Sequence, residues 1–320
     1  MIHITDENIE QSEETAVTLG NFDGIHLGHR TLISLTKKLA EENNLKSAVF
    51  SFTPHPMFLF GNRKTKALIM NSEEKSITLE SMGIDIYIEY PFTKEFAAME
   101  PEVFARDIIF GKMKCRKLVV GDDYRFGAKA RGDYELLKSI SKEFGADVYE
   151  VSSVDMYGSR VSSTRIREAL NTRDIPAANK LLSVPYFVYG KVQNGKHLGR
   201  KFKFPTANIE ADEKKLYPPD GVYATKTIVD GKEYMSITNI GTNPTVNGKK
   251  RTVETNMFDF DKEIYGKNIK TYFYKSLRAE KKFSDVNELY MQIEKDKKAA
   301  KEYFLTDEFK ETDKKTKGTI

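Results

Sequence analysis

Several features that would place a chain in a special class are scarce here. The 320 residues include one cysteine, Cys115, which excludes an internal disulfide and is expected to be a buried packing residue rather than a nucleophile. No apolar run approaches the roughly 20 residues that cross a bilayer. The start, MIHITDENIEQ, lacks the basic and apolar regions of a signal peptide. The sequence therefore predicts a cytoplasmic protein with no membrane partner.

An excess of one charge sign is also missing. The chain has 51 basic and 47 acidic residues, a formal net charge of +4, which is too small for the field that dominates nucleic-acid binding. We therefore expect no nucleic-acid partner. The hydrophobic fraction of 39% can fill cores. Because 320 residues exceed the about 100 to 200 of a usual domain, two domains are expected ahead of one large α/β barrel.

The first part of the chain alternates short β-type runs with amphipathic helical runs. This alternation is typical of a parallel sheet covered by helices. We predict a doubly wound α/β domain over residues 1–184. Its strands are expected at 16–19, 47–52, 85–90, 117–120 and 147–151, and its helices at 31–43, 134–144 and 163–182.

After Val184-Pro185 the hydrophobic period changes from 3.6 to 2, as in half-buried antiparallel strands. We predict a small antiparallel β-barrel over residues 185–306, which removes exposed strand edges. Asp230-Gly231 and Asn247-Gly248 are hairpin signals. A long amphipathic helix is expected from Val286 to Phe304. Residues 307–320 have few apolar side chains and are predicted to be disordered. The expected strands lie at 186–192, 222–229, 234–240, 252–260 and 270–277.

A strand ending at Leu19 runs directly into GNFDGIHLGH and a helix. Ligands bind at such carboxyl ends of parallel strands. His26 and His29 share one face near the helix start, where backbone N–H groups and the helix dipole favour an anion. Gly28 lets a phosphate approach the backbone. A plain turn with surface histidines is the alternative, and metal binding is a weaker one because no third ligand lies nearby.

These residues resemble the first adenylyltransferase motif of the bacterial bifunctional riboflavin kinase/FMN adenylyltransferases, also called FAD synthetases. FTPHP at 52–56, VVGDDYRFGAKARGD at 119–133 and VSSTRIREAL at 161–170 match the family in the same order. The resemblance implies a Rossmann-like nucleotidylyltransferase domain of the HxGH type. Its reaction would be adenylylation of FMN by ATP, which gives FAD and releases pyrophosphate.

Adenylyl transfer needs positioning and charge stabilisation more than a protein nucleophile, because the attacking phosphate is already ionised. The resemblance therefore assigns the transfer to His26 and His29 as phosphate ligands. Taken alone, SSTRIRE would be a plain helix cap with a surface arginine. The residues expected at ATP are Gly20, Phe22, Asp23, Gly28, Ser163, Thr164 and Arg167. Those expected at the flavin are Phe52, His55, Pro56, Asp123, Arg125 and Phe126.

A second group of residues lies between strands of the predicted barrel. The hydroxyl of Thr206 and the amide oxygen of Asn208 are hard donors suited to Mg²⁺ with ATP. Taken alone, PTAN would be an ordinary polar loop. The run to Asn208 resembles the riboflavin kinase signature ending in GFPTAN. Further matches are GVYA at 221–224, NIGTNPT at 239–245, VETNMFDF at 253–260 and LRAEKKF at 277–283.

This second resemblance implies phosphorylation of riboflavin to FMN by ATP. Glu254 would be the general base that takes the proton of the ribityl hydroxyl, although an acidic strand residue is more often a solvated side chain. Arg278 is expected near the flavin or the nucleotide. The residues expected at ATP are Gly195, Gly199, Thr206 and Asn208, the last two also holding Mg²⁺.

The chain departs from the family pattern at a few positions. Lys203 stands where glycine precedes FPTAN, Asn256 where histidine follows the glutamate, and Asp122-Asp123-Tyr124 varies the flavin-side loop. Two alternatives stay open: an enzyme in which only the adenylyltransferase site works, and a non-catalytic flavin-binding or nucleic-acid-binding regulator. The sequence also leaves open a homo-oligomer, passage of FMN between sites and a preference for reduced or oxidised flavin.

Overall fold

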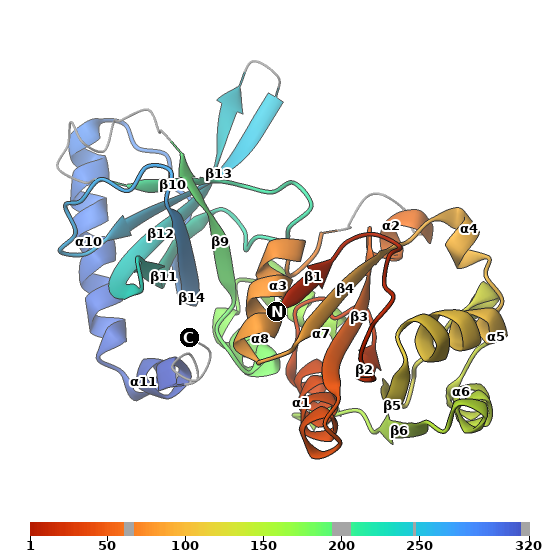
Figure 1. Ribbon diagram of the computed structural model, residues 1–320. Helices are drawn as coiled ribbons and strands as arrows, with labels where there is room; N and C mark the ends of the chain where they lie inside the picture. The colour runs from red at the N-terminus through yellow and green to blue at the C-terminus, as the bar shows by residue number, and fades with distance from the viewer. Residues whose placement is uncertain (61–66, 194–205, 246–247, 315–320) are drawn as a thin grey trace. The chain divides into compact units, whose positions relative to one another are not determined.

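The computed structural model describes residues 1–60, 67–193, 206–245 and 248–314 (Figure 1). By their contacts these residues form two compact units. The first unit comprises Met1–Lys66 and Lys75–Ser162, and the second comprises Ala67–Glu74 and Ser163–Ile320. Residues 163–184 therefore pack with the second unit, whereas the sequence predicts a boundary after residue 184.

The first unit is built on a parallel sheet, as predicted. Its six strands are β1 (Ile2–Ile4), β2 (Thr15–Leu19), β3 (Lys46–Thr53), β4 (Ile86–Pro91), β5 (Cys115–Gly121) and β6 (Asp147–Val151). They lie in the order β1-β4-β3-β2-β5-β6, and every neighbouring pair is parallel. The order runs in opposite directions on the two sides of β2, so the sheet is doubly wound with its switch point between β2 and β5.

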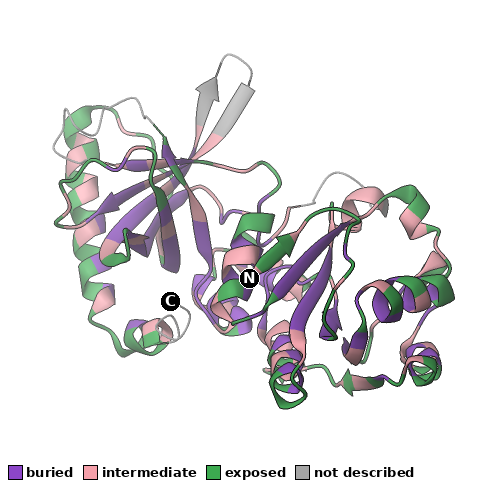
Figure 2. Cartoon of the chain, in the orientation of Figure 1, coloured by how far each residue is buried: buried purple, intermediate pink, exposed green. Residues whose placement is uncertain are grey.

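Helices cover both faces of this sheet. On one face α1 (Leu27–Glu42) packs through Leu39 and Ala40 against Ala16 and Val119. The larger core on the other face joins inward residues of β2 to β5 with a π-helix, η2 (Phe104–Lys112), and with α6 (Tyr134–Ser141). Figure 2 shows the central strands as buried along most of their length. Cys115 lies in this core, as expected, and burial raises the pKa of its thiol.

The remaining elements of the first part of the chain are short. They are α2 (Met57–Phe60), α3 (Ser72–Ser81), α4 (Lys94–Ala97), α5 (Pro101–Val103), η3 (Ala128–Ala130), η4 (Lys142–Phe144) and the hairpin of β7 (Asp155–Met156) with β8 (Ser159–Arg160). The sequence patterns did not predict this hairpin. Tyr157 and Gly158 connect its strands with φ of 57° and 74°, the pair of positive values that a type I′ hairpin turn requires.

The second unit contains the predicted antiparallel barrel. Its strands are β9 (Phe187–Gln193), β10 (Ala207–Glu210), β11 (Gly221–Val229), β12 (Lys232–Thr245), β13 (Gly248–Met257) and β14 (Asn268–Ala279). They close in the order β10-β13-β12-β11-β14-β9. The Asp230-Gly231 hairpin joins β11 to β12, with positive φ at both residues. The other predicted hairpin joins β12 to β13, and its Asn247 lies outside the described residues.

Hydroxyl groups occupy part of the barrel interior. Thr238 on β12 bonds Thr255 on β13 at 2.9 Å, and Thr225 bonds both Ser236 and Thr238. Thr227 and Thr271 extend the chain of hydroxyls, and all six residues are fully buried. Because buried hydroxyls are costly unless paired, this network favours one strand register.

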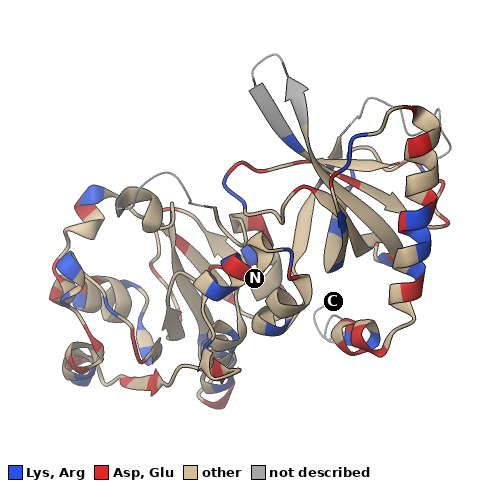
Figure 3. Cartoon of the chain, turned by 180° about the vertical axis from the view of Figure 1, so that it is seen from behind, with Lys and Arg blue, Asp and Glu red and all other residues tan. Residues whose placement is uncertain are grey.

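Helices surround the barrel in the second unit. They are α7 (Ser163–Asn171), α8 (Ile175–Leu182), α10 (Val286–Phe304) and α11 (Asp307–Lys314). The residues expected to form one helix at 163–182 thus form two. The predicted α10 is confirmed, and Figure 3 shows charges of both signs along it.

The expectation of disorder from residue 307 does not hold for Asp307–Lys314. These residues form α11, in which Phe309 is buried against Tyr274 and Phe304. Asp313 pairs with the fully buried Lys226, and the Tyr274 hydroxyl donates to Asp313 at 2.6 Å. One aromatic residue and one counter-charge thus dock a segment of low average hydrophobicity. Residues 315–320 lie outside the described part.

Candidate active sites

Three predicted site segments of the first unit leave the carboxyl ends of adjacent parallel strands. The Gly20 segment follows β2, the His55 segment follows β3 and the Asp123 segment follows β5. These strands flank the switch point, where ligands bind in open α/β sheets. The fold therefore brings the expected ATP and flavin segments to one edge of the sheet.

The turn after β2 is shaped by left-handed backbone. Phe22, Gly24 and Ile25 have φ of 49°, 87° and 41°. Phe22 and Asp23 are buried, and a side chain at Gly20 would press on the Phe22 ring at 3.1 Å. Because Gly20 has no side chain, the buried Phe22 ring can pack against it, which holds the turn close to the end of β2.

His26 and His29 lie side by side at the start of α1. Their rings stack with centroids 3.6 Å apart, and Phe22 packs edge-on to His29 at 5.2 Å. His26 is the N-cap residue of α1, and its Nδ1 accepts the backbone N–H of His29 at 3.4 Å. Because Nδ1 accepts, the neutral ring of His26 carries its proton on Nε2, which is a donor. The predicted placement of this pair at a helix start is confirmed.

Both histidines are neutral at pH 7. Burial, helped by the positive charge of Arg160, lowers the pKa of His26 to about 4. Burial and the neighbouring His26 hold the pKa of His29 well below its usual range. The pair can therefore donate N–H groups to an anion, but it supplies no fixed positive charge before a ligand binds.

A positive charge beside the histidines comes from Arg160, which sequence reasoning missed. Arg160 ends β8 and pairs with Asp123 at 2.8 Å and with Asp122 at 3.5 Å. Its charge lowers the pKa of His26 and His29, which places it within electrostatic reach of both. The Tyr157-Gly158 turn was the available signal, because it creates the hairpin that holds Arg160.

The residues predicted to line the flavin have varied surroundings. Phe52 packs in an aromatic cluster with Phe92 and Phe96, and Phe126 is buried against Phe104. The Nδ1 of His55 accepts the backbone N–H of Met57 at 3.1 Å. Asp123, in the ion pair above, and Arg125 are exposed, while Pro56 is partly exposed.

Ser163, Thr164 and Arg167 lie in the first turns of α7, in the second unit. The Nε of Arg167 donates to the carbonyl oxygen of Ala67 at 3.3 Å, and both residues belong to that unit. The predicted action of these residues together with His26 and His29 stays a prediction.

A row of polar side chains crosses three strands of the barrel. The register places Asn208 of β10 opposite Glu254 of β13, and Glu254 opposite Asn239 of β12. Directly opposed residues share one face, with Cβ atoms about 5 Å apart. Because Thr238 and Thr255 beside them face the interior, the row lies on the outer face of the barrel. Sequence reasoning missed Asn239 as a site residue, although NIGTNPT contains it.

Thr206 and Asn208 lie close together, as predicted. The Asn208 amide nitrogen is 3.5 Å from the Thr206 hydroxyl and 3.3 Å from the Thr206 carbonyl oxygen. Turning the amide would present its oxygen beside the hydroxyl. The pair thus fits a hard cation that takes its other ligands from a nucleotide. Among the described residues, no cluster of three or more His, Cys, Asp or Glu side chains could hold a metal ion.

Arg278 is bound within the second unit. Its guanidinium makes a bidentate contact with buried Asp296 of α10 at 2.9 to 3.0 Å. It also lies over the Phe283 ring at 5.6 Å. These contacts attach the end of β14 to α10, so part of the guanidinium is committed to a structural ion pair.

The remaining residues singled out in the sequence are only partly described by the structure. Gly195, Gly199 and Lys203 lie outside the described residues. Asn256 is buried on β13, two residues after Glu254. None of the helices in the described ranges combines the length and apolar character needed to cross a membrane.

Comparisons with known proteins match both units. A family model described as FAD synthetase matches residues 8–165, and one described as riboflavin kinase matches residues 182–304. A Haemophilus influenzae bifunctional riboflavin kinase/FMN adenylyltransferase is 38% identical over 90% of this chain and 94% of its own. The Bacillus subtilis protein of the same name is 37% identical over 95% and 98%.

The fold also has a counterpart among crystal structures. A Streptococcus pneumoniae chain described as a macrolide-efflux protein has a TM-score of 0.81 and 29% identity, covering 94% of this chain and 99% of its own.

The chain belongs to the bifunctional riboflavin kinase/FMN adenylyltransferase family. It has both activities: riboflavin kinase, which makes FMN from riboflavin and ATP, and FMN adenylyltransferase, which makes FAD from FMN and ATP. The two activities predicted from the sequence, riboflavin kinase and FMN adenylyltransferase, are therefore confirmed for this chain.

Proposed function

We propose that the outer face of the barrel, at Asn208, Glu254 and Asn239, is the riboflavin kinase site. The observation that carries this proposal is the register of β10, β13 and β12, which aligns the three side chains. The ribityl 5′-oxygen attacks the γ-phosphorus of ATP while the bond from that phosphorus to the oxygen bridging the β- and γ-phosphates breaks. The proton of the hydroxyl goes to the Glu254 carboxylate, and ADP leaves.

Mg²⁺ with ATP is the cofactor in this proposal. The Thr206 hydroxyl and the Asn208 amide oxygen would hold it together with ATP. Bound there, the ion would neutralise charge on the phosphates. Asn239, opposite Glu254 in the register, can orient the carboxylate or the hydroxyl. Gly195 and Gly199 stay in the proposal as phosphate-binding residues, and Arg278 stays as a residue near the flavin or nucleotide.

The carboxyl edge of the parallel sheet is the proposed adenylyltransferase site. An oxygen of the FMN phosphate attacks the α-phosphorus of ATP, and the bond to the leaving pyrophosphate breaks. His26 donates from Nε2 to the phosphates, His29 flanks it, and Arg160 adds positive charge. Ser163, Thr164 and Arg167 bind the departing pyrophosphate.

The remaining roles at this site rest on the family resemblance and on the strand ends. Gly20, Phe22, Asp23 and Gly28 shape the ATP turn. The flavin side comprises Phe52, His55, Pro56, Asp123, Arg125 and Phe126. A cytoplasmic location stays a prediction from sequence.

The change Glu254→Gln tests the kinase assignment. Gln keeps the shape of the side chain but cannot accept the proton, so FMN formation from riboflavin should fall by at least about a hundredfold. Conversion of supplied FMN to FAD should stay at the wild-type rate. The control is Asp261→Asn, at an exposed carboxylate of the same unit. Wild-type FMN formation by Glu254→Gln would remove Glu254 from the mechanism.

A further inference from the structure

The segment Ala67–Glu74 lies against residues 212–217 of the second unit. The Leu68 backbone N–H donates to the carbonyl oxygen of Lys214, and the Leu216 N–H donates to that of Leu68, both at 2.7 Å. These bonds form a short parallel bridge between Leu68 and Lys215. The segment is thus attached by backbone pairing to the unit that contains the barrel.

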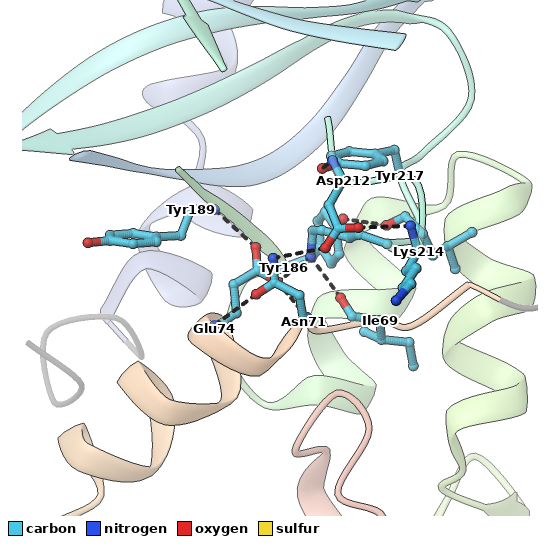
Figure 4. A network of polar contacts seen from close by, with 10 residues as sticks. Ile69, Asn71, Glu74, Tyr186, Tyr189, Asp212, Lys214 and Tyr217 are labelled. Atoms are coloured by element: carbon cyan, nitrogen blue, oxygen red, sulfur yellow. Dashed lines mark hydrogen bonds and ion pairs between the residues drawn. The ribbon is translucent and has the colours of Figure 1, made fainter. Parts of the chain in front are cut away.

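A buried ion pair lies at the end of this segment (Figure 4). Lys215 Nζ is 2.6 Å from Glu74 Oε2, and the two side chains are 1% and 0% exposed. Lys215 Nζ also donates to the Ile69 carbonyl oxygen at 2.8 Å and lies over the Tyr186 ring. Burial raises the pKa of Glu74, and Lys215 opposes that rise. Charges this deep in a protein require a partner and further hydrogen bonds.

The other carboxylate oxygen of Glu74 reaches the barrel. Oε1 accepts the backbone N–H of Tyr189 on β9 at 3.0 Å. Asn71 and Glu74 exchange side-chain to backbone hydrogen bonds at 2.9 and 3.2 Å, the reciprocal pattern of a capping box at the start of α3. Glu74 is thus held by its own helix turn while it binds both Lys215 and β9.

This contact is made where β9 lacks its neighbour β10. Within the described residues, β10 pairs with β9 through Ile209 with Val192 and through Asn208 with Gln193. Tyr189 lies outside that pairing, and the Glu74 carboxylate accepts its N–H. An unsatisfied N–H at this position would weaken β9, which is one of the two strands that pair with β10.

The geometry points to Glu74 as a positioning residue for the kinase site. With Lys215, it anchors the outer edge of β9, and β9 pairs through Gln193 with Asn208 on β10. Glu74 lies within residues 8–165, which match the FAD synthetase model, yet its contacts serve the unit that matches riboflavin kinase. The kinetic consequence rests on the proposed role of Asn208.

Two double variants of the full chain isolate the contact with Tyr189. Glu74→Gln/Lys215→Met and Glu74→Met/Lys215→Met both remove the two buried charges together, which avoids leaving one charge unpaired. Only Gln keeps an oxygen that can accept the Tyr189 N–H. Glu73→Gln, at an exposed carboxylate in the same helix turn, is the charge control.

The Met/Met variant should raise the kinase KM for Mg-ATP about tenfold, since one backbone anchor is lost. The Gln/Met variant should keep a KM near wild type. FMN adenylylation should be unchanged in both. Amide hydrogen exchange over 186–193 should be faster in the Met/Met variant only. Equal KM and equal exchange in the two double variants would overturn the inference.

A third variant keeps the inference testable if the Met/Met chain fails to fold. Asn71→Ala removes the capping partner of Glu74 and leaves no buried charge unpaired. It should raise the same KM and the same exchange rate by a smaller factor, and wild-type values for both would overturn the inference. Faster exchange with an unchanged KM would show that β9 is anchored as described but that Asn208 does not bind Mg-ATP.

Discussion

At the residue scale, the two proposed sites differ in where their charge comes from. The adenylyltransferase edge has two neutral histidines beside Arg160, whereas the barrel face has the carboxylate of Glu254 between two amides. Neutral N–H donors and an arginine suit an anion that arrives already ionised. A carboxylate suits a hydroxyl that has to lose its proton.

The pKa of His26 leads to a pH prediction. Its value of about 4 means that the folded chain leaves His26 neutral at pH 5, whereas an unfolded chain protonates it near pH 6.5. The unfolded state then binds more protons, so the stabilising contribution is present above pH 6.5 and is lost as the pH falls toward 4. NMR of the imidazole nitrogens should show neutral His26, protonated at Nε2, from pH 8 to pH 5. Titration of His26 near pH 6.5 would contradict the burial argument.

The hydroxyl of Thr206 provides a test of the metal proposal. Thr206→Val keeps the side-chain shape and removes the oxygen, so the kinase should need several-fold more Mg²⁺ for half-maximal rate. Adenylylation of FMN should keep its Mg²⁺ dependence. The measurement is the rate of each activity as a function of Mg²⁺ concentration at fixed ATP. An unchanged kinase curve would mean that Thr206 is not a ligand.

At the scale of elements, sequence patterns predicted secondary structure best where a segment was long enough to show a regular hydrophobic period. Five parallel strands, five barrel strands and the helix Val286–Phe304 were predicted from their patterns, whereas the short strands β1 (Ile2–Ile4) and β10 (Ala207–Glu210) were missed. The hairpin of β7 and β8 was missed because two-residue strands have no measurable period, and Arg160 was missed with it. Glu74 could not be predicted, because its partners Lys215 and Tyr189 are far from it in sequence.

The helix α11 shows the same limit. Its average composition predicts disorder, but Phe309 packs on Tyr274 and Asp313 pairs with Lys226, and these contacts dock the helix. Thr306 was a signal that could have been used, because its hydroxyl accepts the backbone N–H of Phe309 at 3.3 Å, as an N-cap does.

Removing α11 should destabilise the barrel unit. A chain ending at Leu305 loses the burial of Phe309, about 1.5 to 3 kcal/mol, and leaves Lys226 without Asp313. The thermal transition of that unit should fall by several degrees. A chain ending at Lys314 is the matched control and should melt like the full chain. Equal transitions for the two shortened chains would show that α11 contributes nothing.

At the scale of the whole molecule, the two activities belong to one chain, and the proposal assigns them to different residues. The family models match separate ranges, and the two rows of proposed catalytic residues lie in different compact units. The two compact units nevertheless differ from the predicted division of the chain after residue 184, because Ala67–Glu74 belongs to the unit that contains the barrel. A truncated chain that begins at residue 185 would therefore lack a segment of the unit that contains the barrel.

The assignment of the two activities to separate sites is tested most directly by the products that a His29→Ala chain makes from riboflavin and Mg-ATP. Chromatography over time, with oxidised and with reduced riboflavin, should show FMN accumulating at the wild-type rate while FAD formation falls by at least about a hundredfold. Loss of FMN formation together with FAD formation, in a folded chain, would contradict the assignment of two separate sites.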